Sequence, residues 1–132
     1  GILENDTNLV VSEKIMTHGN QYAKTKFDVE LNGENASTKV TSRSVVTENS
    51  VQEFESAVIG NTKCFGHVEC DAIIKDTAKV IAIPSIKANN VEANLVHEAT
   101  IGKIAGEQLM KLMSIGLDEK QAEEEIIKGF LK

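Results

Sequence analysis

Residues 62 to 103 read TKCFGHVECDAIIKDTAKVIAIPSIKANNVEANLVHEATIGK, and they contain both cysteines, two of the three histidines and the only proline. Successive side chains of a β-strand point to opposite faces, so the first part of this stretch divides into two rows. One row is apolar or thiol-bearing and the other is mostly polar. The apolar row holds Cys64, Val68, Cys70, Ala72 and Ile74, and the polar row holds Lys63, Phe65, His67, Glu69 and Asp71.

Residues 8 to 60 show the same period of two, clearest where Phe27, Val29 and Leu31 alternate with charged neighbours. Turn signals interrupt the pattern at short intervals, and Asn32-Gly33 favours a tight turn because both residues tolerate a positive φ. Many short strands fit either a β-sandwich or a β-helix. No exact internal repeat decides between them. The remaining turn signals are Gly19-Asn20, Glu48-Asn49-Ser50 and Gly60-Asn61.

After Lys103 the period becomes helical. Leu109, Leu112 and Met113 share one face of a helix predicted over residues 106 to 115, which Gly116 ends as a left-handed cap. Asp118 caps a second helix, with Gln121 three residues later. We expect an αα-hairpin. The second helix has an apolar stripe of Ala122, Ile126, Ile127, Phe130 and Leu131, opposite Glu123, Glu124 and Lys128.

The composition bounds the function. The 132 residues suit one modest core, and 14 basic against 20 acidic residues argue against binding to nucleic acid. No apolar run reaches the ~20 residues of a membrane span. The N-terminal residues also lack the basic-then-apolar pattern of a secretory signal peptide. Two cysteines form no disulfide framework, so we expect free thiols and a cytoplasmic protein. The chain begins with Gly, not Met, which suggests a piece of a longer protein.

Several motifs resemble the C-terminal part of the SufB/SufD family of iron-sulfur cluster assembly proteins. The resemblance is strong after residue 60 and looser upstream, where it rests on the Leu31-Asn32-Gly33-Glu34 turn and on Ser42-Arg43. The matching runs are Gly66-His67-Val68-Glu69-Cys70-Asp71-Ala72, Ile83-Pro84, His97-Glu98-Ala99, Ile101-Gly102-Lys103-Ile104, Gly106-Glu107-Gln108-Leu109 and Gly129-Phe130.

The resemblance implies a mainly β fold: the last coils of a right-handed parallel β-helix over residues 1 to 103, followed by a helical hairpin over residues 104 to 132. It implies an assembly scaffold and not an enzyme. A SufC-type ABC ATPase would dock on the hairpin and hydrolyse ATP, although the hairpin could instead be only a lid on the last coil. The dimer partner would be a SufB or SufD paralogue or a second copy, since an exposed solenoid end invites edge pairing.

The resemblance also implies a site for a transient iron-sulfur cluster. Cys70 falls on the position of an acceptor cysteine, Glu98 on a proposed ligand in SufB, and His97 on one in SufD; Cys70 with Glu98 leans toward SufB. Thiolate, carboxylate and imidazole groups all bind iron in proteins. Strand parity places Glu98 on the face opposite Cys70 and His97, so a bulge, a coil corner or a dimer interface would have to bring them together.

Other interpretations remain. Cys64 reads as an inert buried thiol, and the row of His67, Glu69 and Asp71 as a solvated strand face or a subunit contact. A β-solenoid interaction module with inert thiols would keep the same fold. The sequence has no glycine-bounded nucleophile turn, which argues against a cysteine hydrolase. It also has no compact pairs of metal ligands like those of structural zinc sites. It has no GxxxxGK[ST] phosphate loop, so the chain is not itself expected to be an ATPase.

Overall fold

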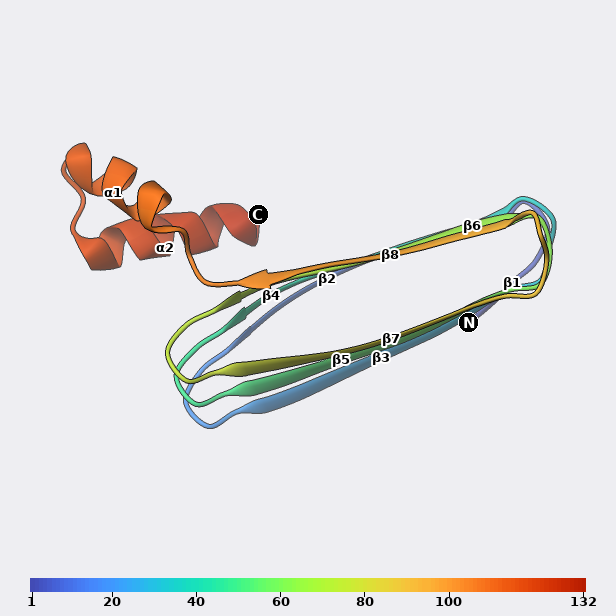
Figure 1. Ribbon diagram of the computed structural model, residues 1–132, viewed down its shortest axis with the longest axis horizontal. Coiled ribbons are helices and arrows are strands. Elements are labelled where there is room, and N and C mark those ends of the chain that lie inside the picture. The colour runs from blue at the N-terminus through green and yellow to red at the C-terminus, as the bar shows by residue number, and fades with distance from the viewer.

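The computed structural model describes residues 1–132, and it is mainly β with two helices at the C-terminus. The elements follow one another without a helix between any two strands (Figure 1). Neither helix has the length and apolar character needed to cross a membrane. The strands are β1 (Ile2–Leu3), β2 (Asn8–Thr17), β3 (Tyr22–Leu31), β4 (Ala36–Val46), β5 (Val51–Gly60), β6 (Cys64–Ile74), β7 (Lys79–Ala88) and β8 (Ala93–Gly102), and the helices are α1 (Gly106–Ser114) and α2 (Glu119–Phe130).

The strands form two parallel sheets, ordered β1-β3-β5-β7 and β2-β4-β6-β8. Consecutive strands therefore lie in opposite sheets, and each strand pairs with the second strand after it, one coil further on. Figure 1 shows the result as a flattened solenoid with tight turns at both ends of the coils. The parallel β-helix predicted from the resemblance is confirmed, and the sandwich is excluded because a sandwich is built from antiparallel sheets.

Each coil takes 28 or 29 residues. Ser37 bonds Asn8 from 29 residues away, and Asn89 bonds Asn61 from 28 residues away. Parallel in-register pairing stacks equivalent positions of successive coils into files. One inward file of Val11, Val40, Val68 and His97 shows how the core is built from small aliphatic side chains. The buried hydrophobic residues are mostly small aliphatic ones.

The core is apolar toward one end of the coils and mixes apolar with polar groups toward the other, where Val45 and Val46 are also fully buried. The apolar part centres on Leu31, Val40 and Val68, each no more than 1% exposed. Toward the turn that follows β4, buried polar groups satisfy one another: Gln52 Nε2 donates to Thr17 Oγ1 at 3.0 Å. Buried polar groups with partners carry little of the usual desolvation penalty. The solenoid therefore tolerates hydroxyl and amide groups in its interior.

An asparagine ladder lines one edge of the solenoid. Asn61 Nδ2 donates to Asn32 Oδ1 at 2.6 Å, and Asn89 Nδ2 donates to Asn61 Oδ1 at 2.7 Å. The turn at Asn32-Gly33 exists, but its predicted basis was wrong, because the positive φ of 60° falls on Asn35. Gly33 is needed for close approach: a Cβ there would lie 1.9 Å from the backbone nitrogen of Asn5.

The helical hairpin follows its predicted capping. After α1, the Gly116 and Leu117 N–H groups donate to the carbonyls of Met113 and Leu112, and Gly116 has a φ of 108°. Asp118 and Gln121 form the predicted capping box of α2. The last strand ends at Gly102 and α1 begins at Gly106, so secondary structure changes type across residues 103 to 105.

One predicted position in α2 was wrong. Glu123 does not lie on the solvent side with Glu124, because its carboxylate contacts Lys75 Nζ at 2.5 Å and only 17% of its side chain is exposed. Lys75 lies in the turn immediately after β6. The inward face of α2 is thus broader than its apolar stripe indicates.

Candidate functional site

Cys70 lies in the interior of the solenoid. It is 1% exposed and belongs to an inward file in which Glu13, Ser42, Cys70 and Ala99 follow one another across four strands. Burial raises the pKa of the Cys70 thiol to about 11, and the charges of Asp71 and Glu13 add to the effect. The thiol is therefore protonated at neutral pH.

His97 lies on the same inward face, on the neighbouring strand β8. Its register partner is Val68, so Cys70 is its diagonal neighbour, with Cα atoms roughly 8 Å apart from the strand spacing and rise. Its Nε2 atom is buried and has no hydrogen-bond partner. Burial also lowers the pKa of His97. The imidazole is thus neutral at pH 7 and has an unused nitrogen.

Glu98 lies on the outer face, as strand parity predicted. The register of β6 with β8 runs without interruption from Cys64 with Ala93 to Ile73 with Gly102, so no bulge redirects the side chain. Glu98 Oε2 is 3.4 Å from His67 Nε2. The structure therefore brings Cys70 and His97 to one face and leaves Glu98 on the other within a single chain.

The outer face around Glu98 carries the remaining polar row. Glu69 and Asp71 flank each other on β6, and Glu69 is the register partner of Glu98. Burial raises the pKa of Asp71, and the adjacent Glu69 raises it further, whereas Arg43 on β4 opposes the shift. No group of three or more His, Cys, Asp or Glu side chains in one chain is arranged to hold a metal ion.

Glu13 is a site residue that the motifs did not single out. It faces inward on β2, where its carboxylate accepts a hydrogen bond from Thr25 Oγ1 at 2.8 Å. Burial raises the pKa of Glu13, and the Thr25 hydrogen bond only partly opposes this. The alternation of Leu9, Val11, Glu13 and Ile15 was the available signal, since it places a carboxylate in an apolar row.

We expect Glu13→Gln to stabilise the fold at neutral pH. A carboxyl whose folded pKa exceeds 4.5 costs stability as the pH rises through 4.5, and the full cost is present above the raised pKa. Glutamine removes that charge and can still accept from Thr25, so the gain should be below about 1 kcal/mol. Urea denaturation at pH 7 and pH 4 measures it.

The gain from Glu13→Gln should disappear at pH 4, where the wild-type carboxyl is protonated. Glu34→Gln is the matched control, because Glu34 lies in an exposed turn. An equal gain at both pH values would contradict the assigned cause.

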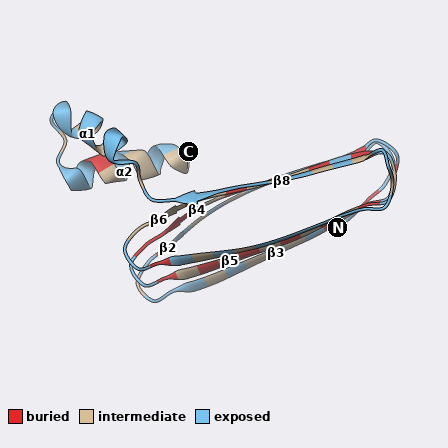
Figure 2. Cartoon of the chain, viewed as in Figure 1, coloured by how far each residue is buried: buried red, intermediate tan, exposed pale blue.

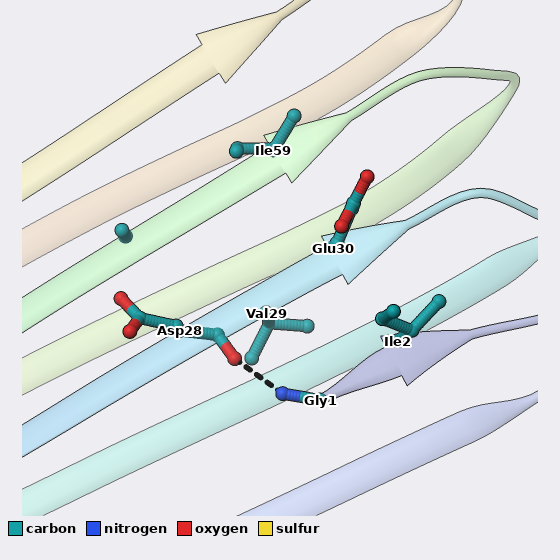
Figure 3. Close-up of a pocket in the computed structure, with 7 residues that line it drawn as sticks. Gly1, Ile2, Asp28, Val29, Glu30 and Ile59 are labelled. Carbon is teal, nitrogen blue, oxygen red and sulfur yellow. Dashed lines mark hydrogen bonds between the residues drawn. The ribbon is translucent and has the colours of Figure 1, made fainter.

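A surface depression on the other sheet is unrelated to these residues. It is lined by Gly1, Ile2, Asp28, Val29, Glu30, Ala57 and Ile59 (Figure 3), and the Gly1 ammonium donates to the Asp28 carbonyl at 2.5 Å. No thiol or imidazole lines it. The candidate site therefore lies at the β8 edge of the sheet that carries β6 and β8, and not in this depression.

Together, the fold and the site define a class of protein: a parallel β-solenoid followed by a helical hairpin, with a thiol and a free imidazole nitrogen in its last coils. The family model of the SUF system FeS cluster assembly, SufBD core domain, matches residues 2–130. The chain belongs to the SufBD family.

Curated relatives support this assignment. The chain is 39% identical over 104 residues to an iron-sulfur cluster assembly SufBD family protein of Methanocaldococcus jannaschii, covering 78% of this chain and 33% of the relative. A Pyrococcus horikoshii family member is 48% identical over 66 residues, which cover 50% and 20%. Iron-sulfur cluster assembly protein SufB of Bacillus subtilis is 32% identical over 102 residues, covering 74% and 22%. The chain thus spans a third or less of these relatives.

Proposed function

We propose that this chain belongs to a scaffold on which iron-sulfur clusters are assembled, with the nascent cluster as cargo and not as a resident cofactor. The observation that carries the proposal is the unpartnered Nε2 of His97, buried beside the Cys70 file in the last coil. A neutral imidazole without a hydrogen bond is a ready ligand, and a thiolate is the ligand that iron-sulfur clusters most often use.

Cys70 would supply the thiolate and His97 the imidazole. Iron must then displace the thiol proton, because binding to a metal requires the deprotonated sulfur. Glu98 would contribute a carboxylate from a second subunit, since it lies on the outer face of its own strand. The buried position of Cys70 requires the last coil to open before cargo can reach the sulfur.

A second subunit would pair with the uncovered last coil. Strands β7 and β8 are the last strands of their sheets. Ile86 and Ile101 continue inward files, yet they are 42% and 40% exposed because no further coil covers them. Unpaired edges and uncovered core residues favour association. We propose a SufB or SufD paralogue, or a second copy, as the partner.

A SufC-type ABC ATPase would bind the hairpin and perform the ATP hydrolysis, which leaves this chain without enzymatic activity. The exposed apolar side chains of the hairpin support this. Met110, Met113 and Ile115 are 71%, 45% and 76% exposed, and flexible methionines are common at binding surfaces. Two free cysteines also suit the reducing cytoplasm.

The alternative is a solenoid interaction module with inert thiols. The burial of Cys70 and its raised pKa favour this alternative, since structural cysteines share both properties. The two functions differ in whether iron binding depends on Cys70 and His97, and that dependence can be measured.

Anaerobic reconstitution with iron and sulfide, on the protein with its SufC-type ATPase, tests the proposal. We expect Cys70→Ser and His97→Phe each to lose most of the bound iron and the visible absorbance while the oligomer stays intact. Cys64→Ser is the matched control, because Cys64 lies on the same strand and face and is 6% exposed. It should load normally.

Glu98→Gln tests the second-subunit ligand separately. Loss of iron from this variant with an intact dimer would support a ligand contributed across the interface. Unchanged loading in both Cys70→Ser and His97→Phe would overturn the proposal and leave the interaction module as the function.

A further inference from the structure

The helical hairpin contacts the solenoid over a small area, which we call the seam. α1 has no buried residue, and Ala122 is the one buried residue of α2. Figure 2 shows the hairpin as mostly exposed or intermediate, extending past the end of the strands. Residues 103 to 105 join it to β8 and have neither helical nor strand structure. Apolar burial therefore contributes little to fixing the orientation of the hairpin.

Two polar contacts cross the seam. Lys75 Nζ donates to Glu123 Oε2 at 2.5 Å, and Arg43 Nη1 donates to the carbonyl oxygen of Phe130 at 3.5 Å. Lys75 directly follows β6, the strand of Cys70, and Arg43 is the register partner of Asp71, the next residue after Cys70. Both contacts thus join α2 to the coils around the candidate site.

The packing beside the Lys75–Glu123 pair is incomplete. One cavity of about 220 Å³ lies between the pair and Met16, Thr47 and Ile127. Another of about 170 Å³ lies between the pair and Ile74, Ile104 and Leu109. Both cavities are lined by Lys75 and Glu123, so the ion pair lies between them. These gaps reduce the packing on both sides of the pair, which is the shorter of the two polar contacts across the seam.

We propose that the Lys75–Glu123 pair is a latch that holds the helical hairpin against the coil carrying Cys70, and that its release frees the hairpin to turn about residues 103 to 105. The Arg43 contact at the C-terminal end of α2 is the second, weaker point of attachment. A partner that moves the hairpin would thereby remove the Glu123 contact from Lys75, which directly follows β6. This consequence rests on the proposed function, whereas the latch itself does not.

The expected effect is modest, because Lys75 is 42% exposed and the pair is screened by solvent. Single pairs of this kind shift an opening equilibrium by about threefold. The exposure of Ile127 reports that opening, since Ile127 lines the cavity between α2 and the solenoid. An Ile127→Cys substitution places a thiol there, and peptide mass spectrometry resolves its alkylation from that of Cys64 and Cys70.

We expect Glu123→Gln and Lys75→Met each to raise the alkylation rate of the introduced thiol about threefold. Reversing the pair, with Lys75→Glu and Glu123→Lys together, should restore the original rate. The matched control is Glu125→Gln, because Glu125 is exposed on the same helix, makes no ion pair and lines neither cavity. Raising the salt concentration should speed labelling in the control but not in Glu123→Gln.

Equal rates in Glu123→Gln and Glu125→Gln would overturn the latch, as would a charge-reversed pair that labels as fast as the single variants. The readout requires no iron. A chain that loads no cluster but shows the labelling pattern would overturn the proposed function and leave the latch standing. The converse pattern would retain the function and remove the latch.

Discussion

Leu31→Ala should lower the free energy of unfolding by about 3 kcal/mol, the usual cost of a buried Leu→Ala substitution. Leu31 is fully buried at the end of β3, where its register partners are Leu3 on one side and Gly60 on the other. Gly60 has no side chain that could fill the space left by the leucine. Urea denaturation followed by circular dichroism measures the loss.

Val10→Ala is the control for this prediction, because Val10 is 63% exposed on the outer face of β2. Its effect should stay within about 0.5 kcal/mol. A Leu31→Ala loss no larger than that of Val10→Ala would mean that the coils do not stack around Leu31 as described.

Local features of the fold could be predicted from the sequence because local physics determines them. The alternation around Phe27 and Val29 identifies a strand, and Asp118 with Gln121 identifies the start of α2. The period of 28 to 29 residues was not recognised, because few positions keep their residue type from coil to coil. Asn32, Asn61 and Asn89 do recur at this period, but files such as Glu13, Ser42, Cys70 and Ala99 change residue type at every coil.

Part of the candidate site could likewise be predicted from the sequence, and part could not. Parity along a regular strand placed Cys70 and His97 inward and Glu98 outward, and the unbroken register of β6 with β8 agrees. Glu13 and Lys75 were missed as members of the site and the seam. Lys75 meets Glu123 across 48 residues, and that distance in the chain is set by how the hairpin docks, not by any local pattern.

The last coil carries both the candidate site and the uncovered edge of the solenoid. Ile86 and Ile101 are exposed at the same coil in which the Nε2 atom of His97 is buried without a hydrogen-bond partner. A covering subunit would bury the isoleucines and could bring a ligand to the histidine in one step. Coupling assembly to cargo binding in this way would make an isolated subunit a poor scaffold.

Cys70 should react with iodoacetamide at pH 8 more than about 100-fold slower in the folded chain than in 8 M urea. With a pKa of about 11, about one thiol in a thousand is ionised at pH 8, against about a quarter of ordinary cysteines. Its 1% exposure slows the reaction further. The rate should rise with pH until the thiol ionises near pH 11 or the chain unfolds. Mass-resolved alkylation of Cys70 measures both rates.

Equal alkylation rates of Cys70 in buffer and in urea would contradict the burial of the thiol. The stronger test adds the partner ATPase and nucleotide to the folded protein. If cargo reaches Cys70 through opening of the last coil, these additions should speed alkylation of Cys70 more than that of Cys64, since Cys64 is the first residue of β6 and keeps its contact with Gly60 on β5. Equal acceleration at both thiols would indicate general loosening of the coils, whereas selective acceleration at Cys70 would indicate a site that opens for its cargo.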